Sequence, residues 1–170
     1  MSPADDTVID EAQGSDLADI AALAQARRLA YQAVQPQFWQ VADDAVARHT
    51  AYLAALIDDP DVVTLVARSG RHVQGFAVAS LAAAPPVYRP GGPTAFVDDF
   101  AVAEEHLWQT AGRALLHAVR ERMAQRGAAQ IVVVCGHHDQ AKMSALLASG
   151  LRCATEWLVA PVLDGAAPAD

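Results

Sequence analysis

Residues 97–135 read VDDFAVAEEHLWQTAGRALLHAVRERMAQRGAAQIVVVC, and this stretch decides the fold. A strand is expected at 94–103, and apolar residues at helical spacing predict a helix over 110–126, with Gly127 as its stop signal. The run 131–135 is continuously apolar, as in strands that a sheet buries on both faces. Strand, helix and buried strand make a βαβ unit, whose crossover is expected to be right-handed.

The rest of the chain adds further strands and helices around this unit. Helices are expected at 16–33, from Asp43-Asp44 to before Pro60, and at 139–149, and strands at 7–12, 62–67, 73–81 and, once or twice, within 151–162. The order β-α-α-β-β-β-α-β-α-β predicts an α/β (α+β) fold, a mixed sheet with helices on both faces. We expect a single domain over 7–163, with loose segments at 1–6 and 164–170.

Composition narrows the class of protein. The 170 residues are 53% hydrophobic and 19% charged, which is typical of a globular chain. No run of 18 apolar residues predicts a membrane span, and residues 1–6 do not resemble a secretory signal, so a cytoplasmic protein is expected. A formal net charge of −8 argues against nucleic acid as a partner and favours small molecules. Cys135 and Cys153 are expected to be core thiols.

The central stretch also carries a family resemblance. Residues 97–105 run into Gly112-Arg113-Ala114-Leu115-Leu116, and the apolar strand to Cys135 and the helix 139–149 follow. This succession resembles the GNAT superfamily of N-acetyltransferases over nearly the whole chain. The resemblance implies two strands that part near Val102 and Cys135 and admit the pantetheine arm of acetyl-CoA. It also implies transfer of the acetyl group to a primary amine of a small molecule or peptide.

The resemblance aligns residues 107–112 with the family's pyrophosphate loop, of the form [RQ]-x-x-G-x-[GA]. Leu107 stands where the family has Arg or Gln, Thr110 stands where it has Gly, and Gly112 matches. Independently of any family, amides at a helix N-terminus can bind a diphosphate. The alternative is a plain helix start with Trp108 as a lid on the core. The expected acetyl-CoA contacts are Phe100, Ala101, Val102, Leu107, Trp108, Gln109, Thr110, Ala111, Gly112 and Arg113.

Two neighbouring carboxylates are candidates for the general base. Asp98 and Asp99 lie on a predicted strand, so their side chains are expected on opposite faces. Either could take the proton of the incoming amine, and the family often has a carboxylate on this strand in that role. Asp99 is preferred, because Asp98 would share its face with apolar residues that pack inward. The alternative is that both acids bind loop amides or arginines.

Other residues are candidates for proton transfer or acceptor binding. His137 and His138 follow the buried strand and could act as general acid or base, while Asp139 suits a helix N-cap. No metal is expected, because adjacent histidines rarely reach one ion. An acceptor wall is expected from Tyr31, Phe38, Trp39 and Tyr88, with core packing or a homodimer contact as the alternative.

Two classes of function remain open. The first is an N-acetyltransferase acting on a small amine, which the acidic charge of the chain would attract. The second is a non-catalytic module of the same fold that binds or senses acyl-CoA, and a partner-binding dimeric domain is a more distant alternative. Fold alone does not choose among them.

Overall fold

The computed structural model describes residues 7–162 and contains one five-stranded sheet, in the order β1-β2-β3-β4-β5. Neighbouring strands are antiparallel except β4 and β5, which are parallel. Parallel neighbours need a crossover, and helix α4 provides it. The strands are β1 (Thr7–Glu11), β2 (Val63–Ser69), β3 (His72–Ala82), β4 (Thr94–Val102) and β5 (Gln130–Val133).

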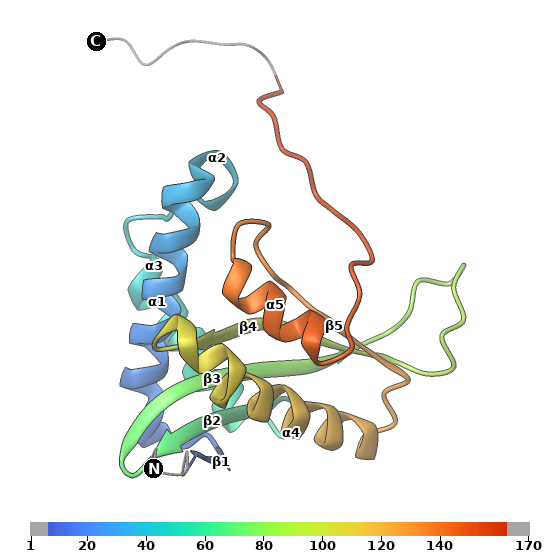
Figure 1. Cartoon of the computed structure of the whole chain (residues 1–170), viewed down its shortest axis with the longest axis horizontal. Helices are drawn as coiled ribbons and strands as arrows, with labels where there is room; N and C mark the ends of the chain where they lie inside the picture. The colour runs from blue at the N-terminus through green and yellow to red at the C-terminus, as the bar shows by residue number, and fades with distance from the viewer. Residues whose placement is uncertain (1–6, 163–170) are drawn as a thin grey trace.

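Helices cover both faces of this sheet (Figure 1). On one face, Ile20, Ala24 and Leu53 from α1 and α3 pack against Phe76 and Val78 of β3. On the other face, side chains of α4, α5 and the 3-10 turn at Glu105–Gln109 form a second core with the side chains that β2, β3 and β4 direct to that face. The helices are α1 (Leu17–Val34), α2 (Pro36–Trp39), α3 (Ala45–Asp58), α4 (Ala111–Gln125) and α5 (Gln140–Ala148), with 3-10 turns η1 (Gly14–Asp16) and η2 (Glu105–Gln109).

The fold class predicted from the sequence is confirmed, and the central helices and strands lie within a few residues of their expected positions. One expectation is wrong: residues 151–162 form no strand within the described chain and run away from the sheet as an irregular trace (Figure 1). A strand needs a neighbour for its backbone groups. Here the segment instead places Trp157 against Phe38 of α2, with ring centroids 6.0 Å apart.

Further expectations concern the two ends of the chain and the burial of its two cysteines. The loose segments expected at 1–6 and 164–170, and residue 163, lie outside the described residues. Cys135 is half-buried, and burial raises the pKa of its thiol to about 11. Cys153 is exposed, so its expected place in the core is wrong, because it belongs to the irregular segment. None of the described helices is long and apolar enough to cross a membrane.

Candidate active site

The site lies where β4 and β5 part. Their pairing runs from Thr94 with Gln130 to Val97 with Val133, and Val134 N–H donates to the Val97 carbonyl at 2.9 Å. Beyond Val97, β4 continues for five residues to Val102 while the chain of β5 turns into the loop before α5. Two strands of one parallel pair therefore separate at a defined residue, and side chains from α1, α3 and α5 converge on the stretch of β4 beyond it.

A β-bulge marks the same point. Val78 of β3 pairs with Asp99 and Ala79 pairs with Val97, so Asp98 is an extra residue in β4. The bulge reverses the alternation of the strand from there on, and the Phe100 carbonyl points toward α5, where it accepts from Lys142. Because the N–H and C=O of one strand residue point to the same edge, the Phe100 N–H faces the same gap.

The bulge also changes the expected placement of the two carboxylates. Asp98 is exposed although Phe100 is buried, so the expectation that Asp98 shares an inward face with Phe100 is wrong. The extra residue shifts the alternation by one position between them. Asp98 Oδ1 accepts from the Asp99 N–H at 2.9 Å, and the residue as a whole is exposed.

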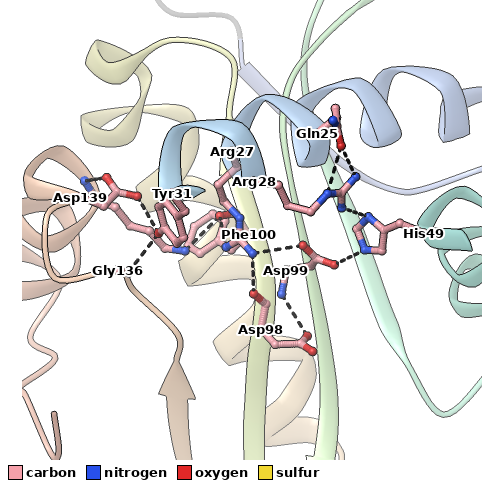
Figure 2. Close-up of polar contacts among 11 residues, drawn as sticks. Gln25, Arg27, Arg28, Tyr31, His49, Asp98, Asp99, Phe100, Gly136 and Asp139 are labelled. Atoms are coloured by element: carbon pink, nitrogen blue, oxygen red, sulfur yellow. Dashed lines mark hydrogen bonds and ion pairs between the residues drawn. The ribbon is translucent and has the colours of Figure 1, made fainter. Parts of the chain in front are cut away.

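Asp99 is held by two helices (Figure 2). Its carboxylate lies 2.7 Å from His49 Nε2 on α3 and 3.3 Å from Arg27 Nη2 on α1. Burial alone would raise the pKa of this carboxyl, but the His49 hydrogen bond and the charges of Arg27, His49 and Arg28 outweigh burial, and the pKa is lowered. Arg28 in turn contacts His49 Nδ1. Asp99 is therefore a paired anion.

Arg27 reaches across this network to the backbone of β4. Its two terminal nitrogens donate to the Phe100 carbonyl at 3.4 Å and the Asp98 carbonyl at 3.2 Å. Its Nε is buried and finds no hydrogen-bond partner among the described residues. The guanidinium thus fixes the backbone of the bulge, and its Cζ lies 5.3 Å from the Tyr31 ring centroid.

Tyr31 connects α1 to the loop after β5. Its hydroxyl donates to Asp139 Oδ2 at 2.9 Å and accepts from the Gly136 N–H at 3.0 Å. Burial is the main cause that raises the pKa of Tyr31, so the phenol stays protonated. A Cβ on Gly136 would lie 2.9 Å from the Tyr31 Cζ, which requires glycine there. Asp139 also accepts from the Lys142 N–H, as expected for the N-cap of α5.

Lys142 reaches from α5 to β4 beyond the point where the strands part. Its side chain is fully buried, and its Nζ donates to the Phe100 carbonyl at 3.0 Å. The ring centroids of Phe100 and Trp108 lie 5.2 and 5.4 Å from Nζ. Burial, with the charge of Arg27 as the next cause, lowers the pKa of this amine to about 7.

The start of α4 has the chemistry of an anion site. No described side chain caps this helix, and Ala111, Gly112 and Arg113 form its first turn. These amides are among the four that an α-helix leaves without an internal partner. Leu107 and Trp108, by contrast, are buried in the core, and a Cβ on Gly112 would lie 2.6 Å from Trp108. The position that resembles the family's loop therefore retains backbone donors in place of the usual arginine.

The remaining predicted residues lie farther out. Tyr88 is 71% exposed, and its backbone N–H donates to the Pro85 carbonyl within the same loop. His137 and His138 are exposed in the turn before α5. Phe38 and Trp39 form α2, where their rings pack together with Trp39 against Tyr31. Among residues 7–162 there is no group of three or more His, Cys, Asp or Glu that could hold a metal ion.

Sequence reasoning missed Arg27, Arg28, His49 and Lys142. Two of them carried a usable signal, because helical spacing puts them on buried faces. Lys142 is three and four residues before the buried Ala145 and Leu146, and His49 is four before the buried Leu53. A lone polar residue on such a face needs a buried partner.

One family model matches the sequence of this chain. The model of the acetyltransferase (GNAT) family matches residues 21–149. No curated protein matches the chain in sequence.

Three solved structures show how widely the fold is shared. A variant of the BH1408 protein of Bacillus halodurans is 18% identical with a TM-score of 0.80, over 92% of this chain and 99% of that chain. A predicted acetyltransferase of Clostridium acetobutylicum, solved with acetyl-CoA, is 15% identical with a TM-score of 0.69, over 94% and 98%. An aminoglycoside 6'-N-acetyltransferase of Acinetobacter baumannii is 18% identical with a TM-score of 0.68, over 94% and 99%. With the family model covering most of the described residues, the chain belongs to the GNAT family of acetyltransferases and is an acyltransferase.

Proposed function

We propose that the protein transfers the acetyl group of acetyl-CoA to a primary amine of a small cationic molecule or peptide. The observation that carries this proposal is the bulge at Asp98, which turns the polar backbone of Phe100 into the gap between β4 and β5. A structure of similar fold contains acetyl-CoA, and another is an aminoglycoside N-acetyltransferase. The first supports the proposed donor, and the second supports the proposed class of acceptor.

The residues present fit the donor at the start of α4. The first-turn amides of Ala111, Gly112 and Arg113 would hold the diphosphate, and the Arg113 side chain is exposed beside them. Phe100, Ala101 and Val102 would line the arm that leads to the thioester. When bound, acetyl-CoA supplies an acetyl group activated by its sulfur leaving group.

The backbone of β4 can stabilise the charge that forms during transfer. The Phe100 N–H faces the gap between the strands and is proposed to donate to the acetyl oxygen. Arg27 holds the neighbouring carbonyls, so this donor is fixed before the reaction begins. Fixed donors aimed at a developing negative charge are usually the largest single contribution to the rate enhancement of an enzyme.

The acceptor is proposed to approach from the α1 and α3 side of β4. Asp98 is exposed there. Burial, together with the negative charges of Asp98 and Asp99, raises the pKa of the half-exposed Tyr52, so both negative charges act on this side of β4. Carboxylates favour a cationic amine through long-range attraction. Phe38 and Trp39 would form an aromatic side of the same approach.

For the proton of the attacking amine, the pairing of the carboxylates reverses the preference drawn from the sequence. Asp99 is held as an anion by Arg27 and His49, and a base with a lowered pKa accepts a proton poorly. Asp98 is exposed, and its side chain accepts one local hydrogen bond, from the Asp99 N–H. We assign Asp98 as the proton acceptor, directly or through water, and Asp99 as the positioning residue. His137 or His138 would return a proton to the leaving thiolate.

One experiment separates this enzyme from a module that only binds acyl-CoA. Purified protein is incubated with acetyl-CoA and a panel of polyamines, aminoglycosides and peptides, and the released CoA thiol is measured. In parallel, thermal unfolding is followed with acetyl-CoA, CoA or NAD. A ligand at about 100 times its dissociation constant adds roughly 2.7 kcal/mol, so CoA and acetyl-CoA should raise the Tm and NAD should not. Stabilisation without thiol release from any amine would leave the binding module, and absence of both would end the proposal.

A further inference from the structure

Lys142 is the single lysine of the chain, and it is fully buried. Its Nζ sits between β4 and α5, beyond the residue at which β4 and β5 stop pairing. Buried lysines normally pair with a carboxylate. Among residues 7–162, no carboxylate forms an ion pair with this amine, and its hydrogen-bond partner is the neutral carbonyl of Phe100. Its surroundings are therefore one neutral carbonyl and the rings of Phe100 and Trp108, with no anion in direct contact.

The amine lies beside the position proposed for the acetyl group. Nζ contacts the carbonyl of the same residue, Phe100, whose N–H is proposed to hold the acetyl oxygen. Trp108, whose ring lies 5.4 Å from Nζ, belongs to the turn that leads into α4 and its diphosphate donors. The amine therefore lies between the two elements that would hold the donor.

We propose that Lys142 is itself an acyl acceptor, and that acetyl-CoA bound between the parted strands acetylates its Nζ. The inference rests on the proposed function, because it needs the same donor in the same gap. The side chain then becomes a substrate of its own enzyme, in a reaction that each chain performs once.

The transfer needs no further reactant. The lone pair of the neutral Nζ attacks the thioester carbonyl carbon, a C–N bond forms and the C–S bond breaks. The electron pair leaves with sulfur, and the proton released by nitrogen ends on the CoA thiol. The product is an amide with one N–H left, which can still donate to the Phe100 carbonyl. Acetylation thus removes a buried charge and keeps the hydrogen bond.

The electrostatics around Nζ favour the nucleophilic form. A lysine amine in an apolar pocket is activated because burial disfavours its protonated state. Arg27 on α1 lowers the pKa further, whereas Cys135 and Asp139 after β5 and Asp99 on β4 act in the opposite direction, and the net value is about 7. Near neutral pH a large share of the amine is therefore unprotonated, unlike an exposed lysine.

The test uses the full chain, acetyl-CoA and mass spectrometry. Intact mass is followed over time, and peptide mapping locates the modification. We expect one acetyl group on Lys142, at a rate that saturates with acetyl-CoA and falls when excess CoA is added. The rate should rise with pH and level off above about 7. Lys142→Arg, which keeps the cation and cannot be acetylated in this way, is the matched control and should stay unmodified at this position.

A second control separates bound-donor transfer from chemical acetylation. Wild-type chain unfolded in urea carries Lys142 as an ordinary exposed lysine, so it should react much more slowly at neutral pH. Equal rates in folded and unfolded chain, or a rate insensitive to excess CoA, would overturn the inference. Thiol release with an added amine while Lys142 stays unmodified would overturn it and leave the proposed function intact. Failure of CoA to bind and of Lys142 to react would overturn both.

Discussion

The carboxylate of Asp99 lies 2.7 Å from Nε2 of His49, and the same carboxylate lies 3.3 Å from Arg27. One side chain of β4 therefore ties α3 and α1 to the strand at its bulge (Figure 2). Asp98, its neighbour, forms a local bond and is exposed. The two adjacent aspartates thus have separate roles: Asp99 stabilises the fold, and Asp98 is the proposed proton acceptor.

Substitution by asparagine distinguishes these tasks. Asp99→Asn removes the charge that Arg27 and His49 share, and we expect the free energy of unfolding to fall by about 1–3 kcal/mol. Asp98→Asn should leave stability nearly unchanged and lower the rate of acetyl transfer by about 10²–10⁴-fold, with CoA affinity kept. Urea denaturation and thiol release measure the two effects. If instead Asp99→Asn alone lost turnover at full stability, the assignment of the base would pass to Asp99.

The lowered pKa of Asp99 gives this substitution a pH signature. A carboxyl whose pKa is lower in the folded than in the unfolded chain contributes stability above its unfolded value of 3.8, and that contribution is lost as pH falls through the folded pKa. The difference in unfolding free energy between wild type and Asp99→Asn should therefore shrink below about pH 4. A constant difference across this range would show that the ion pairs do not set the cost.

The fold could be predicted from the sequence, whereas the site could not, because the fold follows from local patterns and the site depends on contacts between distant residues. The apolar run ending at Cys135 and the helical stripe before Gly127 are local patterns, and they predicted β5 and α4 within a few residues. The bulge at Asp98 depends on how β3 pairs with β4, which alternation along one strand does not reveal. Contacts such as Lys142 with Phe100 join residues 42 positions apart, and only the packed chain brings them together.

Arg113 tests the anion site at the start of α4. Gly112 is a poor position for this purpose, because a side chain there would collide with Trp108 whatever its charge. Arg113 is exposed in the same helical turn, so Arg113→Glu reverses charge without disturbing the core. We expect CoA affinity to fall by roughly tenfold to a hundredfold, since charged hydrogen bonds contribute about 1.5–3 kcal/mol.

Calorimetric titration with CoA and with dephospho-CoA measures this loss, and Arg113→Ala is the matched variant without the added negative charge. Arg113→Ala should show a smaller decrease than Arg113→Glu, because only the latter repels the phosphates. Unchanged affinity in both variants would place the diphosphate away from this helix start.

Lys142→Met should stabilise the protein at neutral pH. The pKa of Lys142 is about 7 in the folded chain and 10.5 in its ordinary state, so the folded state disfavours the charged amine. Wild-type stability therefore falls as pH decreases from about 10.5 to about 7, by on the order of 1 kcal/mol per pH unit, and is constant below that range. The variant lacks this dependence.

Thermal or urea unfolding of the two proteins over this pH range gives the comparison, and the difference between them cancels the titration of Cys135, which both contain. A difference that widens toward pH 7 is expected. Equal pH profiles would mean that Lys142 titrates as an exposed lysine does.

Tyr31→Phe tests whether α1 positions the loop before α5. The hydroxyl of Tyr31 serves both the Gly136 N–H and the Asp139 carboxylate, and its loss leaves two half-buried polar groups without that partner. We expect the free energy of unfolding to fall by about 1–3 kcal/mol, because a buried polar group that loses its hydrogen-bond partner costs its full desolvation free energy. Tyr52→Phe removes a hydroxyl from a side chain that is 52% exposed and should change stability little. Hydrogen exchange at Gly136 should quicken in Tyr31→Phe alone; equal exchange in both variants would show that the tyrosine packs against this loop without holding it.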